Sequence, residues 1–192
     1  MGNHATSLQT IPPLMLITRR ATLTDLPAIL ALVQRVVPLM HASGNFQWSA
    51  DYPNAAVFTA DIAQNHLWVA ELGGVVAGVA ALTQDQDAEY AQANWDVAEP
   101  ALVTHRLAVA PTAQGQGVAL ALMEQAEKQA VVQGLRVLRV DTNSKNAATR
   151  RLFPKLGYQF AGEITLAFRP GLRFFCYEKW LGELTATDGF GI

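Results

Sequence analysis

The chain has 192 residues, of which 51% are apolar, and a formal net charge of −2 at pH 7. This is enough apolar residue for one sizeable core, and it leaves no surplus of Lys and Arg to bind a nucleic-acid backbone. The one cysteine, Cys176, excludes an internal disulfide and a cysteine-built zinc site, which fits a reducing cytoplasm. We find no apolar run of the roughly 18 to 20 residues that cross a bilayer, so a soluble protein without membrane contact is expected.

The N-terminal half predicts three strands and two helices. The first helix is expected to start at Thr24 and end before Gly44, because apolar residues between them recur at intervals of three and four. Gly73-Gly74 separates two apolar runs and is typical of a two-residue β-hairpin turn, since glycine reaches the positive φ that such turns require. The predicted strands are residues 14–20, 67–72 and 75–82. The second helix is expected to follow Pro53 and to run to about Gln64.

The C-terminal half opens with a segment, residues 83–100, that is acidic, lacks Lys and Arg, and has no clear period. It is expected to be a loop. Strands are predicted over 102–110, 135–140, 157–167 and 173–180, with helices over 118–132 and 146–155 and a last hairpin turn at Pro170-Gly171. No repeat or linker divides the chain, so we expect one domain over 14–184, a flexible leader over 1–13 and a flexible tail over 185–192.

Gln114 to Ala119 form a glycine loop between a predicted strand and a predicted helix. The unpaired N–H groups of such a helix start, at the positive end of its dipole, are suited to bind an anion, and glycine lets a phosphate approach the backbone. A Walker loop would need a lysine near Val118, and a Rossmann fingerprint would need a small residue where Leu120 stands. The missing lysine excludes a Walker site, and dinucleotide binding is the poorer fit.

The order of two motifs resembles the GNAT superfamily of N-acetyltransferases. Its pyrophosphate loop, Gln/Arg-x-x-Gly-x-Gly/Ala, is matched by Gln114, Gly117 and Ala119. Its later signature, an Asn and then a helix ending in Leu-Tyr-x-Lys-x-Gly-Phe/Tyr, is matched by Asn146 and by Leu-Phe-Pro-Lys-Leu-Gly-Tyr over 152–158. The resemblance extends more loosely over residues 16–181.

This resemblance implies a mixed α+β fold with a central, mostly antiparallel sheet of about seven strands, whose fourth and fifth strands splay apart, and about four flanking helices. It implies an enzyme that transfers the acetyl group of acetyl-CoA to a primary amine by direct attack in a ternary complex, without a metal. A homodimer would also agree with the family, although the sequence offers no interface. The residues implied to hold acetyl-CoA are Leu107, Ala108, Val109, Gln114, Gly115, Gln116, Gly117, Val118, Ala119, Asn146 and Phe153.

The acceptor amine is not identified by the sequence, because one fold serves many acceptors. The alternative from another class is a non-catalytic module that binds or senses acyl-CoA. A nucleotide-dependent oxidoreductase is a third hypothesis, which lacks the fingerprint residues.

His105 is the candidate base that takes a proton from the acceptor amine, because an imidazole titrates near neutral pH. On a regular strand, residues 103, 105, 107 and 109 would share one face, which places His105 beside the implied donor residues. Alternatively, His105 is a packed or surface histidine. Other candidate bases, each of which could instead be solvated, are Glu89, Asp96 and Glu99.

Phe153 departs from the family pattern, since many members have there a tyrosine that protonates the leaving thiolate. Tyr158 or a water molecule is a candidate substitute. Cys176 lies among aromatic residues without a histidine partner and is expected to be inert core. The spacing of His4, His41 and His66 does not suggest a metal site.

Overall fold

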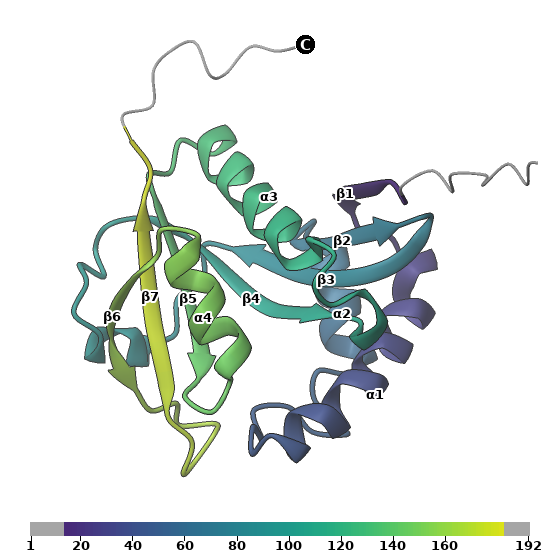
Figure 1. Cartoon of the computed structure of the whole chain (residues 1–192). Coiled ribbons are helices and arrows are strands. Elements are labelled where there is room, and N and C mark those ends of the chain that lie inside the picture. The colour runs from purple at the N-terminus through teal and green to yellow at the C-terminus, as the bar shows by residue number, and fades with distance from the viewer. Residues whose placement is uncertain (1–13, 183–192) are drawn as a thin grey trace, which may run out of the picture.

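The computed structural model describes residues 14–182 and has one mixed sheet of seven strands, in the order β1-β2-β3-β4-β5-β7-β6 (Figure 1). Neighbouring strands are antiparallel except β4 and β5, which are parallel. This confirms the expected fold class. The expected leader, 1–13, and tail, 185–192, lie outside the described residues. The strands are β1 (Leu16–Arg20), β2 (Leu67–Leu72), β3 (Val75–Thr83), β4 (Ala101–Val109), β5 (Val137–Asn143), β6 (Gln159–Ile164) and β7 (Phe174–Trp180).

Four α-helices cover the sheet: α1 (Leu26–Ala42), α2 (Ala55–Ala63), α3 (Val118–Val132) and α4 (Ala147–Lys155). Helices α3 and α4 lie in front of the sheet in Figure 1, and α2 lies behind it. Gly78 in β3 allows α3 to pack closely, because a Cβ there would lie 2.5 Å from Cγ1 of Val118. Three short 3-10 turns complete the secondary structure: η1 (Leu23–Asp25), η2 (Ala88–Gln92) and η3 (Pro111–Ala113).

The elements differ from the sequence expectations mainly at their ends. The β2–β3 hairpin turns at Gly73 and Gly74, with φ of 60° and 80°, as predicted. Strand β5 begins two residues later than expected. The β6–β7 connection is not a tight turn at Pro170-Gly171 but a longer loop, since β6 ends at Ile164 and β7 begins at Phe174.

The helical stretch Leu23–Ala42 is, by length and composition, apolar enough to cross a membrane, which the sequence analysis did not anticipate. Its apolar run is interrupted by five polar residues, namely Thr24, Asp25, Gln34, Arg35 and His41. Four residues of α1 are buried in the core: Ile29, Leu32, Val33 and Val37. An apolar helix that packs on a sheet has the same composition.

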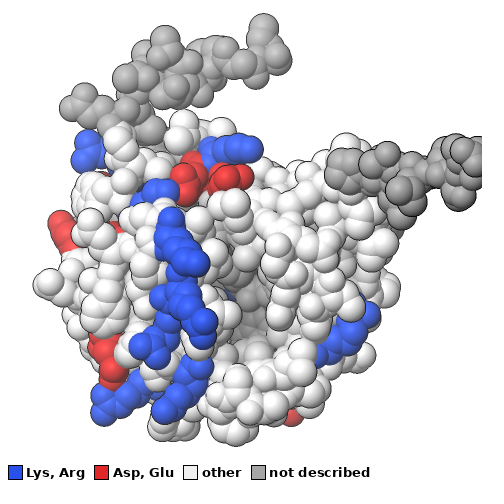
Figure 2. Space-filling view, in the orientation of Figure 1, with Lys and Arg blue, Asp and Glu red and all other residues white. Residues whose placement is uncertain are grey.

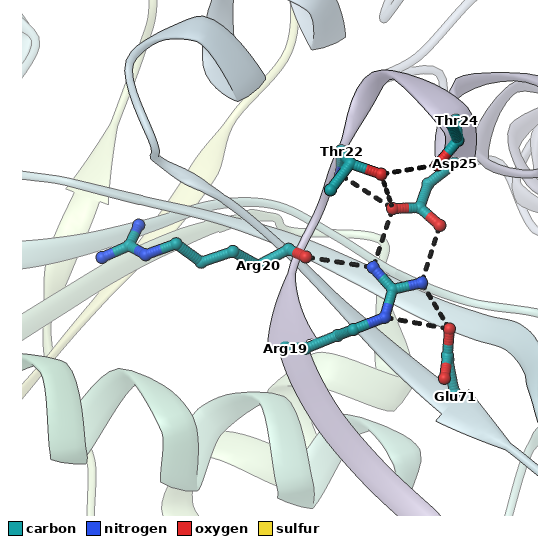
Figure 3. A network of polar contacts seen from close by, with 6 residues as sticks. All are labelled: Arg19, Arg20, Thr22, Thr24, Asp25 and Glu71. Carbon is teal, nitrogen blue, oxygen red and sulfur yellow. Dashed lines mark hydrogen bonds and ion pairs between the residues drawn. The ribbon is translucent and has the colours of Figure 1, made fainter.

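An ion-pair network fixes the start of α1 (Figure 3). Arg19 of β1 donates two hydrogen bonds to the carboxylate of Asp25, at 2.7 and 2.8 Å, and also pairs with Glu71 of β2. The backbone N–H and the hydroxyl of Thr22 donate to the same carboxylate. Thr22 is thus the N-cap of the turn η1, and the N-cap of α1 is Asp25, one residue after the expected Thr24. These bonds, above all those from Arg19, lower the pKa of Asp25 to about 2.

A bulge in β4 changes which residues share a face. Arg106 has a φ of 54°, and the pairing with β3 shifts between Ala81–His105 and Val79–Ala108. Beyond the extra residue the alternation of side chains is one step out of phase. The expectation that residues 103, 105, 107 and 109 share a face is therefore wrong: 103 and 105 lie on the α2 side, and 107 and 109 on the α3 side.

The acidic segment between β3 and β4 is ordered around one buried arginine. Arg139 of β5, 0% exposed, donates to the side chain of Gln86, to the carbonyl of Asp96 at 2.6 Å, and to Glu178 of β7. Its guanidinium also lies over the ring of Trp95. These contacts hold the segment against the back of the sheet, so its acids occupy defined positions.

Candidate active site

The site lies where β4 and β5 separate. The two strands pair only up to Thr104 and Val140. Beyond that point β4 continues to pair with β3, and β5 with β7, which leaves the two edges that face each other without a strand partner. A cavity of about 790 Å³ occupies the split and is lined by both edges. The predicted splay of the fourth and fifth strands is confirmed.

One end of the cavity is formed by the glycine loop and the start of α3. Gly117 is the N-cap in the left-handed conformation, with φ of 81°, which favours glycine. The first intrahelical bond is from Ala121 N to Gly117 O, so the preceding amides have no helical partner. The loop residues that line the cavity are Gln114, Gly115, Gly117, Val118 and Ala119.

Gln116 is the loop residue that does not line the cavity. Its side chain is exposed and donates to the carbonyl of Thr112 at 2.9 Å. The three β4 residues predicted with the loop, Leu107, Ala108 and Val109, all line the cavity. The structure thus brings together most of the residues that the sequence analysis assigned to the donor.

Helix α4 forms the opposite wall on the same face of the sheet. The side chain of Asn146 lines the cavity and also caps the helix, accepting from Thr149 N at 3.3 Å. Phe153 lines the cavity while packing on the rings of Tyr158 and Tyr177. Tyr158 itself lies outside the cavity lining, and burial raises the pKa of its hydroxyl, which makes it a poor substitute acid.

The other half of the cavity, on the α2 side, carries titratable groups. His105 lies there, with Nε2 3.4 Å from the carbonyl oxygen of Asp85. Asp85, Asp87 and Asp141 also line it, and Asp141 accepts a 2.6 Å hydrogen bond from the hydroxyl of buried Tyr90. Burial raises the pKa of Asp87; His105 opposes the rise, and the nearby charge of Asp141 adds to it.

Sequence reasoning missed these three aspartates and chose neighbouring acids that the structure places elsewhere. The carboxylate of Glu89 accepts from Ala167 N, and that of Asp96 from Ala98 N. Neither residue lines the cavity, nor does Glu99. Their positions in the chain could have indicated the site. Asp85 and Asp87 follow the end of the buried strand β3, and Asp141 lies on β5, which separates from β4, the strand of His105.

Aromatic residues surround the acidic half. Trp48 and Tyr52, between α1 and α2, and Phe168, between β6 and β7, line the cavity. The guanidinium of Arg169 lies over the Tyr52 ring, 4.5 Å from its centre. Arg106, the other arginine in the lining, is held by two hydrogen bonds of 2.7 and 2.8 Å to Asp61 of α2, which neutralise its charge.

The remaining candidates of the sequence analysis do not contribute to this cavity. Cys176 is buried in a second apolar cluster, and burial raises the pKa of its thiol. Within residues 14–182, three or more His, Cys, Asp or Glu side chains nowhere gather closely enough to hold a metal ion. His4 lies outside the described residues, and Nε2 of His41 lies 2.8 Å from the Trp48 carbonyl.

The sequence profile of the acetyltransferase (GNAT) family matches residues 33–158, which include the whole of β4, the glycine loop and α4. The chain belongs to this family. A search of curated proteins found no match. Among solved structures, a GNAT family acetyltransferase from Streptococcus agalactiae 2603 is 25% identical, with a TM-score of 0.72 over 88% of this chain and 96% of that one.

Two other similar structures share the GNAT fold at lower identity. The Salmonella typhimurium protein yncA, solved with its cofactor acetyl-CoA, is 22% identical, with a TM-score of 0.62 over 89% of this chain and 96% of that one. The ribosomal-protein-S18-alanine N-acetyltransferase of Escherichia coli is 20% identical, with a TM-score of 0.63 over 90% of this chain and 97% of that one.

Proposed function

We propose that the protein is an N-acetyltransferase that transfers the acetyl group of acetyl-CoA to a primary amine. The observation that carries this proposal is the continuity of one cavity, which joins the uncapped start of α3 to the split between β4 and β5 and then to the group of His105 and three aspartates. The diphosphate of acetyl-CoA requires an anion site, and its pantetheine arm requires free backbone groups. The acceptor amine requires a titratable group that takes its proton.

The donor is assigned to the α3 side of the cavity. The amides of Gln114 to Ala119 would hold the pyrophosphate, and the free edge of β4 at Leu107 to Val109 would pair with the amides of the pantetheine arm. Asn146 and Phe153 would contact the donor from α4. The yncA protein has the same fold and was solved with acetyl-CoA, which supports acetyl-CoA as the donor.

The surface charge also favours binding of acetyl-CoA on the side of the cavity that α3 and α4 cover. Lys and Arg side chains gather along α4 beside the hollow of the cavity (Figure 2). The exposed basic residues of α4 and the turn before it are Lys145, Arg150, Arg151 and Lys155. A cationic strip at the mouth of a cleft attracts a polyanion and raises its association rate. Acetyl-CoA is such a polyanion.

In this mechanism the neutral amine attacks the carbonyl carbon of the thioester directly. An amine with a pKa of about 10.4 is neutral in only about one molecule in 2,500 at pH 7, so a nearby base raises the reactive fraction. His105 is the proposed base, because it lies at the end of the split on the acceptor side. A thiol of pKa about 8.5 is a tolerable leaving group, so the phenylalanine at 153 is compatible with turnover.

The charge of the acceptor half favours a cationic acceptor. Three aspartates line it, Arg106 is neutralised by Asp61, and the remaining arginine, Arg169, is stacked on Tyr52. A second positive charge on the acceptor would offset the repulsion among these carboxylates, and the aromatic walls would contact its methylene groups or its cation.

An acceptor screen tests the proposal. Release of CoA thiol is measured with acetyl-CoA and a panel of amines, together with the heat of acetyl-CoA binding. Saturable release with at least one amine is the expected result. Binding without turnover across the panel would favour the acyl-CoA-sensing module, which the phenylalanine at 153 supports. An absence of binding heat at millimolar acetyl-CoA would overturn both hypotheses.

We further propose that residues 14–184 form one domain, because all described strands belong to one sheet. We assign the protein to the cytoplasm because its single, buried cysteine fits a reducing compartment. A homodimer stays a prediction from the family.

A further inference from the structure

One buried hydroxyl group in the cavity lining, that of Thr104, makes no hydrogen bond to the described residues. Thr104 lines the cavity and is only 2% exposed. Burying a hydroxyl without a partner destabilises the folded protein. An orphan of this kind at a binding site calls for a partner supplied by the ligand.

Thr104 occupies the closed end of the split. It is paired with Val140 in the last step of the β4–β5 ladder, before the two strands separate. Side chains alternate along β4, so Thr104 lies on the same face as Leu102, whose partner is Leu138. The partner of Thr104 on β3 is Leu82. Leu82 lies on the same face as Gly78, against which Val118 of α3 packs. The Thr104 side chain therefore lies on the face of the sheet that α3 and α4 cover, which is the side of the cavity that Phe153 lines.

This position matters for the step in which sulfur leaves. The amine nitrogen forms a bond to the carbonyl carbon, the C–S bond breaks, and its electron pair stays on sulfur. The amine proton goes to the base on the α2 side. A hydrogen-bond donor beside the sulfur stabilises the charge that develops there, and the phenyl ring of Phe153 cannot donate.

We propose that the Thr104 hydroxyl donates this hydrogen bond to the sulfur of the thioester as the C–S bond breaks. The inference rests on the proposed function. Thr104 does not give up its proton, because an aliphatic hydroxyl is far too weak an acid. The thiolate takes its proton from solvent after it leaves the site. Thr104 is thus a catalytic residue that acts by hydrogen bonding alone.

Two variants separate the hydroxyl from the shape of the side chain. Thr104→Val replaces the hydroxyl by a methyl group, and Thr104→Ser keeps it. We expect Thr104→Val to lower kcat about tenfold with little change in KM for acetyl-CoA, and Thr104→Ser to stay within about threefold of the parent. Because the hydroxyl is unpaired in the free protein, the melting temperature of Thr104→Val should be equal or higher. A fall in melting temperature with kcat unchanged would overturn the proposal.

Binding of products isolates the contact with sulfur. The dissociation constants of CoA and of desulfo-CoA, which lacks the sulfur, are measured by calorimetry at pH 9 for the parent and for Thr104→Val. We expect Thr104→Val to weaken CoA about tenfold and to leave desulfo-CoA unchanged. Equal changes for both ligands would refute the inference. If the parent protein binds neither ligand, the proposed function itself fails, which is a different result.

A second-site change completes the test. Phe153→Tyr places a phenol on the same side of the cavity. In the Thr104→Val background it should restore most of the lost kcat, whereas in the parent its gain should be smaller. The same gain in both backgrounds would show that the two side chains act on different groups and would contradict the assignment to sulfur.

Discussion

The two halves of the cavity are built in different ways. The donor half, on the α3 and α4 side, is made of backbone amides, a free strand edge and small or apolar side chains. The acceptor half, on the α2 side, is made of charged and aromatic side chains from the α1–α2 connection, the β3–β4 segment, β5 and the β6–β7 loop. A site made of backbone groups keeps its affinity when a side chain is replaced, unless the new side chain fills the site. A site made of side chains loses binding groups when one of them is replaced.

This contrast predicts where substitutions act. Changes in the donor half should alter acetyl-CoA affinity only when they add volume or charge to the loop. Changes in the acceptor half should alter kcat or the choice of amine and leave acetyl-CoA affinity intact. The four predictions below would each break or sharpen this division, and they run from the largest expected effect to the smallest.

Gly117→Asp should weaken acetyl-CoA binding about 1000-fold, because a carboxylate about 4 Å from a phosphate costs roughly 4 kcal/mol at an intermediate dielectric. Calorimetry measures the dissociation constant. Gly117→Ala is the matched control: its Cβ meets only Leu16, at 3.7 Å, so the cost is backbone strain at φ of 81°, about 1 kcal/mol. Gln116→Ala should cost less than either, since its side chain is exposed. Equal affinity in Gly117→Asp and Gln116→Ala would break the comparison.

His105→Ala should lower kcat at pH 7 about 100-fold and flatten the pH–rate profile, because the base for the amine is lost. The acetyl-CoA dissociation constant should not change, since His105 lies on the other face of the sheet from Leu107 and Val109. Steady-state rates between pH 5 and 9 and calorimetry check both statements. His66→Ala, a histidine outside the cavity, is the control. A pH profile like that of the parent would remove His105 from the mechanism.

Asp87→Asn should change the choice of amine. For 1,4-diaminobutane, which carries a second positive charge, kcat/KM should fall about fivefold, and for butylamine the fall should be under about twofold, because the lost attraction of about 1 kcal/mol acts on the distant charge. Asp96→Asn is the control, since its side chain lies outside the cavity. If kcat/KM falls equally for both amines, Asp87 does not interact with the second positive charge of the acceptor.

The network around Asp25 is remote from both halves and should affect neither. Its pKa is lowered from 3.8 to about 2, so the ionised form is stabilised in the folded protein. This contribution is present above pH 4 and is lost as the pH falls toward 2. Asp25→Asn should cost about 1 to 2 kcal/mol at pH 7, a value reduced because Arg19 is about one-third exposed.

Urea unfolding of the parent and of Asp25→Asn between pH 7 and pH 2 measures this difference. It should shrink as the pH approaches 2, where about half of the Asp25 carboxylates are protonated in the folded protein. A constant difference across the range would mean that the carboxylate charge is not the source of stability. A changed acetyl-CoA affinity in this variant would mean that the start of α1 and the cavity are coupled.

Much of the fold and the donor half could be predicted from the sequence because both depend on short segments. The Gly73-Gly74 turn needs two adjacent positive φ values, and the glycine loop needs glycine at 117, directly before a helix, for the same reason. Such features can be recognised from a few adjacent residues of the sequence. The spacing of apolar residues likewise placed the central sheet and the helices, with errors of a few residues at the ends, where tertiary contacts decide.

The acceptor half could not be predicted, because no local pattern records it. The bulge at Arg106 moved Leu107 and Val109 to the face opposite His105, and buried Arg139 fixed a segment that looked like a solvated loop. Only the packing of residues distant in the chain brought Asp85, Asp87 and Asp141 beside His105. The sequence alone thus determined the glycine loop, for which we propose diphosphate binding, since backbone amides in a short loop suffice for it. The tertiary structure decided which side chains meet the acceptor, since their positions depend on contacts between separate elements.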